Sequence, residues 1–156
     1  MPDMSVQEIW DFLCAGTRTA HVGTTRPDGR PHVKPVWFVL DGRPGDFQLV
    51  FTTYADSVKG RGLRRDGRVA VSVDDPAPPY AFVIVEGTAQ ISDDLGQVRA
   101  AATRIGGRYM GAGRATEFGA RNGVPGELLV RVTPARVIAQ RAVSGVITPR
   151  LAHQNG

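Results

Sequence analysis

The residues best suited to chemistry lie between Thr52 and Val73, in the run TTYADSVKGRGLRRDGRVAVSV. This run predicts a strand end, a short basic helix, a tight turn and a second strand. Asp56 and Ser57 are residue types that cap the start of a helix. Unpaired N–H groups and a partial positive charge at such a start suit a phosphate. Because Lys59 and Arg61 follow within one turn, we expect both to hold the same anion.

A phosphate site needs directed donors as well as charge. Hydroxyl donors are offered by Thr52, Thr53 and Ser57, and further positive charge by Arg64 and Arg65. We expect the cations of this short helix to be partly exposed. Taken alone, the run also fits a solvated basic helix between two strands, with no ligand.

Composition favours one soluble, strand-rich domain with no metal site. The 156 residues are 42% hydrophobic and 22% charged, and the 19 glycines and 11 prolines favour many short strands. Cys14 is the single cysteine, which excludes an intramolecular disulfide and a cysteine-based zinc cluster. His21 and His32 have no third ligand at a suitable spacing. No apolar run is long enough to span a membrane, and the first residues do not resemble a secretory signal, so we expect a cytoplasmic protein.

The charge distribution indicates a small anionic ligand. The formal net charge is +4, and the positive charge is dispersed except for a cluster at Lys59–Arg68. Few aromatic residues interleave with that cluster, as single-stranded nucleic acid would require. We therefore expect neither a nucleic acid nor a membrane as the partner.

The elements around this run predict a small antiparallel barrel. We expect a cofactor-binding domain over residues 1–142 and a weakly ordered tail over 143–156. The pattern predicts helices over 5–16, 94–109 and 116–121, with a capping box in the first, and six strands over 17–25, 31–40, 47–53, 68–74, 81–92 and 128–142. Side chains fill the inside of so small a barrel, so a cofactor must bind on its outer surface or at a subunit interface.

The order of these elements resembles the pyridoxamine 5′-phosphate oxidase-like superfamily of split β-barrel proteins. The K-x-R-x-L-R-R-D helix from Lys59 carries most of the resemblance, with E-G-T-A at Glu86–Ala89 and I-G-G-R-Y-M-G at Ile105–Gly111 in support. The similarity covers roughly residues 5 to 140. Within the superfamily the chain looks most like the actinobacterial F420-dependent (flavin/deazaflavin) oxidoreductases.

The resemblance implies a fold, an activity and a set of cofactor contacts. It implies a mainly β split barrel with peripheral helices, forming a homodimer with two cofactor grooves at the interface. The activity would be hydride transfer between reduced F420 and an unsaturated small organic acceptor. We expect the cofactor to be bound by Lys34, Pro35, Val36, Trp37, Thr52, Thr53, Ser57, Val58, Lys59, Arg61, Arg64 and Arg65, with Tyr80, Arg108 and Tyr109 as a wall donated by the other subunit.

Two alternatives remain at this point. One is an FMN protein, including a pyridoxamine 5′-phosphate oxidase, although the end TPRLAHQNG is a poor match to the Arg-x-His substrate motif of those oxidases. The other is a non-catalytic cofactor carrier, haem carrier or regulator on the same barrel. No side chain is a clear proton donor, so the catalytic residues are unassigned and water or a tyrosine would complete protonation.

Overall fold

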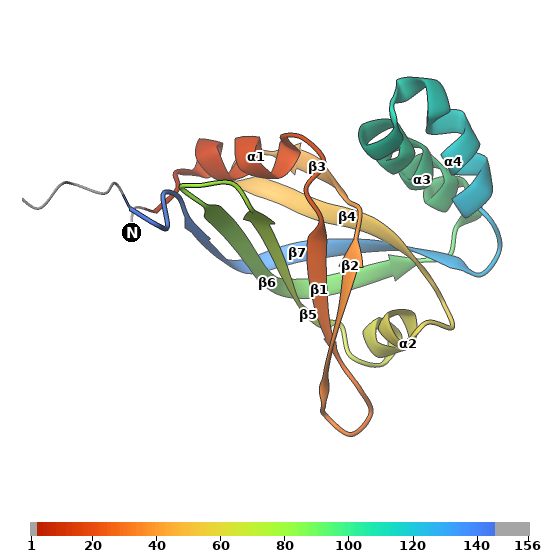
Figure 1. The fold of residues 1–156 in the computed structure, drawn as a ribbon. Coiled ribbons are helices and arrows are strands. Elements are labelled where there is room, and N and C mark those ends of the chain that lie inside the picture. The colour runs from red at the N-terminus through yellow and green to blue at the C-terminus, as the bar shows by residue number, and fades with distance from the viewer. Residues whose placement is uncertain (1–2, 146–156) are drawn as a thin grey trace, which may run out of the picture.

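The computed structural model describes residues 3–145. In chain order the elements are α1 Val6–Cys14, β1 Ala20–Thr25, β2 Pro31–Val36, β3 Val39–Arg43, β4 Asp46–Tyr54, α2 Val58–Arg65, β5 Arg68–Asp75, β6 Ala81–Ser92, α3 Leu95–Met110, the 3-10 turn η1 Ala112–Arg114, α4 Ala115–Asn122 and β7 Glu127–Gln140 (Figure 1). Among residues 3–145, no helix combines the length and the apolar character that crossing a membrane requires.

The strands form one curved antiparallel sheet that does not close, in the order β2-β1-β5-β6-β7-β4-β3 (Figure 1). The predicted split barrel is confirmed, but it has seven strands instead of six. The strand predicted over 31–40 breaks after Val36, because Trp37 and Phe38 leave the ladder and the chain resumes as β3 at the opposite edge, beside β4. These two residues are therefore the covalent link between the two edges of the sheet.

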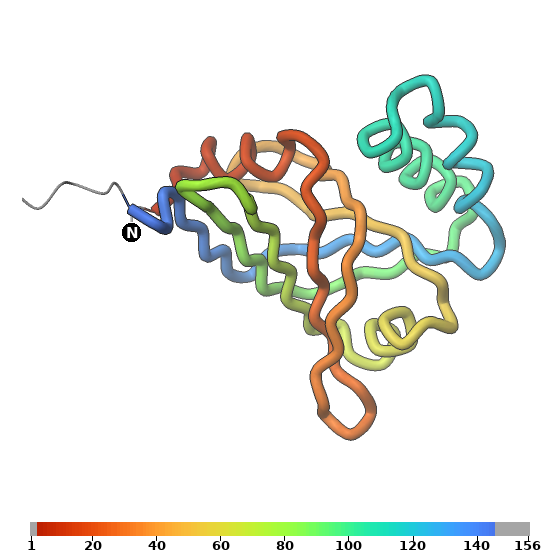
Figure 2. The backbone as a smooth tube through the Cα atoms, in the orientation of Figure 1, coloured from red at the N-terminus to blue at the C-terminus, as the bar shows by residue number. Residues whose placement is uncertain are grey.

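The two faces of β4 and β7 serve two different cores. Phe51 and Val132 belong to a cluster inside the curved sheet, which Leu13 of α1 and Leu63 of α2 also join. Val50, from the other face, packs with α3. The tube in Figure 2 shows α3 and α4 standing outside the sheet, away from α1. Since buried side chains occupy the inside, a large planar ligand must bind outside it.

Several predicted boundaries shift for identifiable reasons. Ser5 forms the predicted capping box, accepting from the Glu8 N–H at 3.1 Å, but α1 ends at Cys14. Gly16 then takes a positive φ of 58°, so β1 begins only at Ala20. Pro134, which lacks an N–H, sits beside an irregularity in the β6–β7 pairing, so β7 continues past it. Of the tail predicted over 143–156, the part after residue 145 lies outside the described residues.

Candidate functional site

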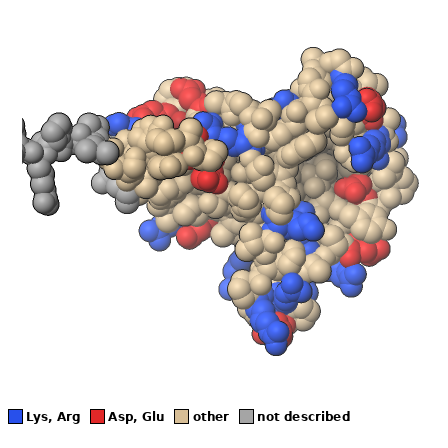
Figure 3. Space-filling view, viewed as in Figure 1, with Lys and Arg blue, Asp and Glu red and all other residues tan. Residues whose placement is uncertain are grey.

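A hollow of about 370 Å³ lies outside the sheet, where α2 and the end of β4 meet α3, α4 and the start of β7. In Figure 3 the surface is recessed between the α3–α4 unit and the strands. The hollow brings together two sequence regions that were predicted to share a site. Its lining consists of Pro35, Val36, Trp37, Thr52, Thr53, Tyr54, Ser57, Lys59, Ile105, Asn122 and Glu127.

Local geometry at the start of α2 fixes Lys59 in this hollow. The Ser57 hydroxyl caps the helix by accepting from the Gly60 N–H at 2.9 Å. At Gly60 a β-carbon would lie 2.3 Å from the Tyr54 carbonyl oxygen, so glycine allows the helix to approach β4 closely. Leu63, one turn after Lys59, packs into the barrel core. Both side chains therefore face inward, against the expectation of a partly exposed lysine.

Lys59 is a buried cation without an acidic partner. Only 7% of its surface is exposed, and its Nζ atom lies 5.7 Å from the centre of the Phe51 ring. Among residues 3–145, no carboxylate oxygen lies within 4.0 Å of it. Burial lowers the pKa of Lys59, Lys34 lowers it further and Glu127 opposes the shift. An anion entering the hollow would supply the missing counter-charge.

The three predicted hydroxyl donors are not equivalent. The Ser57 hydroxyl donates to the Tyr54 carbonyl at 2.7 Å, so its hydrogen is committed to the helix cap. Thr53, which is buried, lies 3.2 Å from the Ser57 oxygen. Thr52 occupies the other face of β4, and its hydroxyl makes no hydrogen bond within the described part of the chain. Thr52 is therefore the hydroxyl that is available to a ligand.

The arginines of α2 do not join Lys59, against the expectation of one shared anion site. Val58, Arg61 and Arg65 line a separate hollow of about 390 Å³ with the β1–β2 turn. Arg61 donates twice to the Asp56 carbonyl, at 2.7 and 2.9 Å. Arg64 lines another surface, near the end of β6. The reason is helical periodicity, because residues two apart point to different sides of a helix.

Trp37 forms a flat wall of the hollow, with Tyr109 behind it. The two rings stack with centroids 4.9 Å apart and an angle of 7° between their planes. Trp37 keeps 41% of its surface exposed. The Tyr109 hydroxyl donates to the Arg18 carbonyl at 2.5 Å and accepts from the Phe38 N–H at 3.4 Å. Burial raises the pKa of Tyr109, so this phenol stays protonated and serves structure.

Arg108 is likewise engaged within its own chain. Its guanidinium donates to the carbonyls of Leu13 at 2.7 Å, Phe38 at 2.8 Å and Gly16 at 3.0 Å. These bonds tie α3 to the end of α1 and to the link between β2 and β3. The donors expected to face a cofactor from a second subunit are thus used to hold the fold together.

Tyr80 and Lys34 do not line the hollow. Tyr80 follows the cis bond between Pro78 and Pro79 and precedes β6, whereas α3 follows the opposite end of that strand. Lys34 lies exposed on β2 and acts on Lys59 through its charge. Sequence reasoning did not assign Tyr54, Ile105, Asn122 or Glu127 to the site, although all four line the hollow. Tyr54 and Ile105 lie within quoted motifs, whereas Asn122 and Glu127 belong to none and reach the hollow through helix packing and strand pairing.

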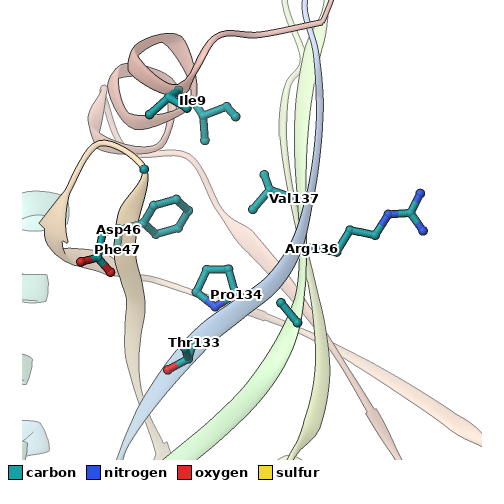
Figure 4. A pocket seen from close by; sticks show the side chains of 10 residues that line it. Ile9, Asp46, Phe47, Thr133, Pro134, Arg136 and Val137 are labelled. Carbon is teal, nitrogen blue, oxygen red and sulfur yellow. The ribbon is translucent and has the colours of Figure 1, made fainter.

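A second concave surface lies at the start of β4, beside α1. This hollow of about 290 Å³ is lined by apolar groups that include Ile9, Phe47 and Val137, and Figure 4 shows the Arg136 side chain pointing away from it. It holds no inward-pointing cation for a phosphate. The hollow at Lys59 is therefore the better candidate site.

Comparisons with known proteins identify the family and agree with the fold. The chain matches the family described as pyridoxamine 5′-phosphate oxidase over residues 6–141. Its structure is similar to that of a conserved hypothetical protein from Mycobacterium tuberculosis, with 26% identity and a TM-score of 0.78, over 98% of this chain and 95% of that one. An F420 reductase is 25% identical with a TM-score of 0.63, over 88% and 98% of the two chains.

A FAD-binding protein from Mesorhizobium loti shares the fold alone, at 17% identity and a TM-score of 0.64, over 88% of this chain and 95% of that one. No protein of curated function matches the sequence. The family match spans most of the chain and agrees with the split barrel. The chain therefore belongs to the pyridoxamine 5′-phosphate oxidase family.

Proposed function

We propose that this protein is an oxidoreductase that binds coenzyme F420 in the hollow at Lys59 and transfers a hydride to an unsaturated small organic acceptor. The observation that carries the proposal is the buried Lys59 ammonium, which lacks an acidic partner and faces a hollow walled by an exposed Trp37. Family membership supports a flavin-type oxidoreductase, and the similarity to an F420 reductase supports a deazaflavin.

The residues present fit such a cofactor. Lys59 would hold the phosphate and Thr52 would donate to it, while the free face of Trp37 would contact the planar ring. As an edge strand, β2 offers backbone N–H and C=O groups for the polar edge of the ring. On the outer side of α2, a separate hollow carries the positive charges of Arg26, Arg61 and Arg65, which would attract the acidic tail of F420.

The protein's part in the reaction is to bind, orient and exclude water. The reduced ring supplies the hydride when it is bound. Tyr109 does not supply the proton, because its hydroxyl hydrogen is donated to the Arg18 carbonyl. A proton reaching the acceptor therefore comes from water or from another group that faces the hollow.

The hollow is one-sided, so we propose that a second copy of the chain completes it. Trp37, Tyr54, Val58 and Val124 are all at least 40% exposed. Three of them lie on the lining of the hollow or at the start of α2 beside it, where a second chain would cover them. Sedimentation should give about twice the mass of one chain, and a monomer that still binds the cofactor would refute the second wall.

Binding spectroscopy tests the cofactor assignment. Absorption spectra of the purified protein, followed by equilibrium titration with F420, FMN and haem at moderate salt, separate the three candidates. We expect F420 to bind more tightly than FMN, and equal or tighter FMN binding would refute the assignment. FMN is the second candidate because the pyridoxamine 5′-phosphate oxidase-like proteins that the chain resembles include FMN proteins. Preferential haem binding would instead indicate a carrier.

A further inference from the structure

The hollow also contains a carboxylate that no motif predicted. Glu127 is the first residue of β7, opposite Tyr54 in the β4–β7 pairing. Its side chain is half-buried and forms no hydrogen bond or ion pair with any residue of the described chain. It lines the same hollow as Lys59. A phosphate bound at Lys59 would therefore also meet the charge of Glu127.

The charges around this pair come from few elements. From α2 the hollow receives Lys59 and from β7 it receives Glu127, while α3 and α4 contribute only the uncharged Ile105 and Asn122. On β2, the charge of Lys34 lowers the pKa of Lys59, while burial and the charges of Arg26, Lys34 and Lys59 lower the pKa of His32. Burial raises the pKa of Glu127 and Lys59 opposes that rise. When Glu127 is ionised, its negative charge offsets part of the positive charge that Lys59 brings to the hollow.

We infer that Glu127 is a specificity-determining residue, which reduces the advantage that Lys59 alone would give to a phosphomonoester dianion over a phosphodiester monoanion. This inference rests on the proposed function of the hollow. Repulsion scales with the product of the charges, so an ionised Glu127 repels a dianion with twice the energy with which it repels a monoanion. A phosphomonoester gains its second charge with a pKa of about 6, whereas a diester stays singly charged.

The test compares two ligands with the same ring. F420 supplies the phosphodiester, and the fragment of F420 that ends at the phosphate supplies the monoester. Dissociation constants are measured at pH 8 for the wild-type protein and for Glu127→Gln. We expect the substitution to strengthen F420 binding about threefold and monoester binding about tenfold, because doubling an energy squares the fold-change. Reporting each ligand as the ratio of variant to wild type cancels the contributions that both proteins share, including contacts with the tail of F420.

A second measurement varies the pH. At a site with a lone lysine, the monoester should bind more tightly at pH 8 than at pH 5, because its charge doubles. Because burial raises the pKa of Glu127, its carboxyl is less ionised at pH 5 than at pH 8, so monoester affinity should rise less steeply with pH in the wild-type protein than in Glu127→Gln. The effect of Glu127→Gln should be smaller at pH 5 than at pH 8. Glu86→Gln, which removes an exposed carboxylate on β6, is the matched control and should change neither ligand.

The outcomes separate the two proposals. If both ligands bind, and Glu127→Gln changes both dissociation constants by the same factor or changes neither, the inference about Glu127 is wrong and the proposed site stands. The same holds if monoester affinity rises with pH as steeply in the wild-type protein as in Glu127→Gln. If neither deazaflavin phosphate binds, the proposed function fails and the role of Glu127 fails with it.

Discussion

Replacing Lys59 with methionine should stabilise the free protein and weaken its cofactor binding. Methionine keeps an unbranched chain of similar length and removes the charge. The substitution separates two effects of burying Lys59. An unpaired buried ammonium lowers the free energy of unfolding, and the same ammonium strengthens the binding of an anionic ligand. Opposite signs in stability and affinity would mark Lys59 as a ligand-binding group, whereas a packing residue would lose stability.

The size of the stability change follows from the surroundings of Lys59. Burying an ammonium costs several kcal/mol even after relaxation. The cation–π contact with the Phe51 ring, 5.7 Å from Nζ, offsets about 0.5–1 kcal/mol of this cost. Solvent in the hollow hydrates the part of Lys59 that remains exposed and offsets more of it. A net gain of about 1 kcal/mol for Lys59→Met is expected, which raises Tm by about 2–4 °C for a chain of this length.

The pH dependence gives the sign of the effect independently. The pKa of Lys59 is lowered in the folded state from its usual 10.5, so folding disfavours the charged form. The penalty is fully present below the folded-state pKa and disappears as pH rises from that value towards 10.5. The Tm difference between Lys59→Met and the wild type should therefore narrow at alkaline pH.

The assay pairs thermal unfolding with cofactor titration. Loss of one charge-assisted hydrogen bond should weaken F420 binding by about 1.5–3 kcal/mol. Arg68→Ala is the control, because Arg68 is basic and near in sequence but exposed and paired with Asp66 at 2.7 Å. It should leave binding unchanged. A destabilised Lys59→Met protein, or equal losses of affinity in the two variants, would refute the reasoning.

Three further substitutions test the scaffold of the site by denaturant unfolding. Arg108→Lys removes the planar guanidinium that donates to several backbone carbonyls, so the free energy of unfolding should fall by about 2 kcal/mol. An unchanged denaturation midpoint would mean that these hydrogen bonds contribute nothing. Gly106→Ala should cost about 1–3 kcal/mol, because its β-carbon would lie 2.3 Å from that of Phe118 on α4; full stability would show that the two helices adjust freely. Tyr109→Phe leaves two backbone groups without a partner and should cost about 1–2 kcal/mol while the F420 dissociation constant changes less than twofold; a larger loss of affinity would place the phenol in the site.

The parts of the site that the sequence predicted are those held by short-range rules. Ser57 caps α2 because its hydroxyl reaches the helix start, and this cap places Lys59. The co-location of Trp37 with Lys59 followed from resemblance to a family. Arg61 was predicted to share the Lys59 anion but lines a separate hollow, since residues two apart on a helix face different sides.

The parts that were missed depend on contacts between distant segments. Arg108 and Tyr109 were predicted to face a partner, but their donors serve carbonyls that only tertiary packing brings near. The burial of Lys59 depends on how closely α2 approaches β4, which glycine spacing permits but does not dictate. Glu127 enters the hollow through its pairing with Tyr54, and strand register is not readable from a single sequence.

Through its contacts with the short link at Trp37 and Phe38, α3 sets the position of the Trp37 ring that walls the hollow. Outside the ladder, the Phe38 N–H and C=O are held by Tyr109 and Arg108, and Trp37 rests on the Tyr109 ring. Any change that shifts α3 along the sheet would move Trp37 with it. Substitutions in α3 that touch no ligand should thus widen or narrow the hollow. Under the proposed function, they would change which acceptors fit while Lys59 stays in place.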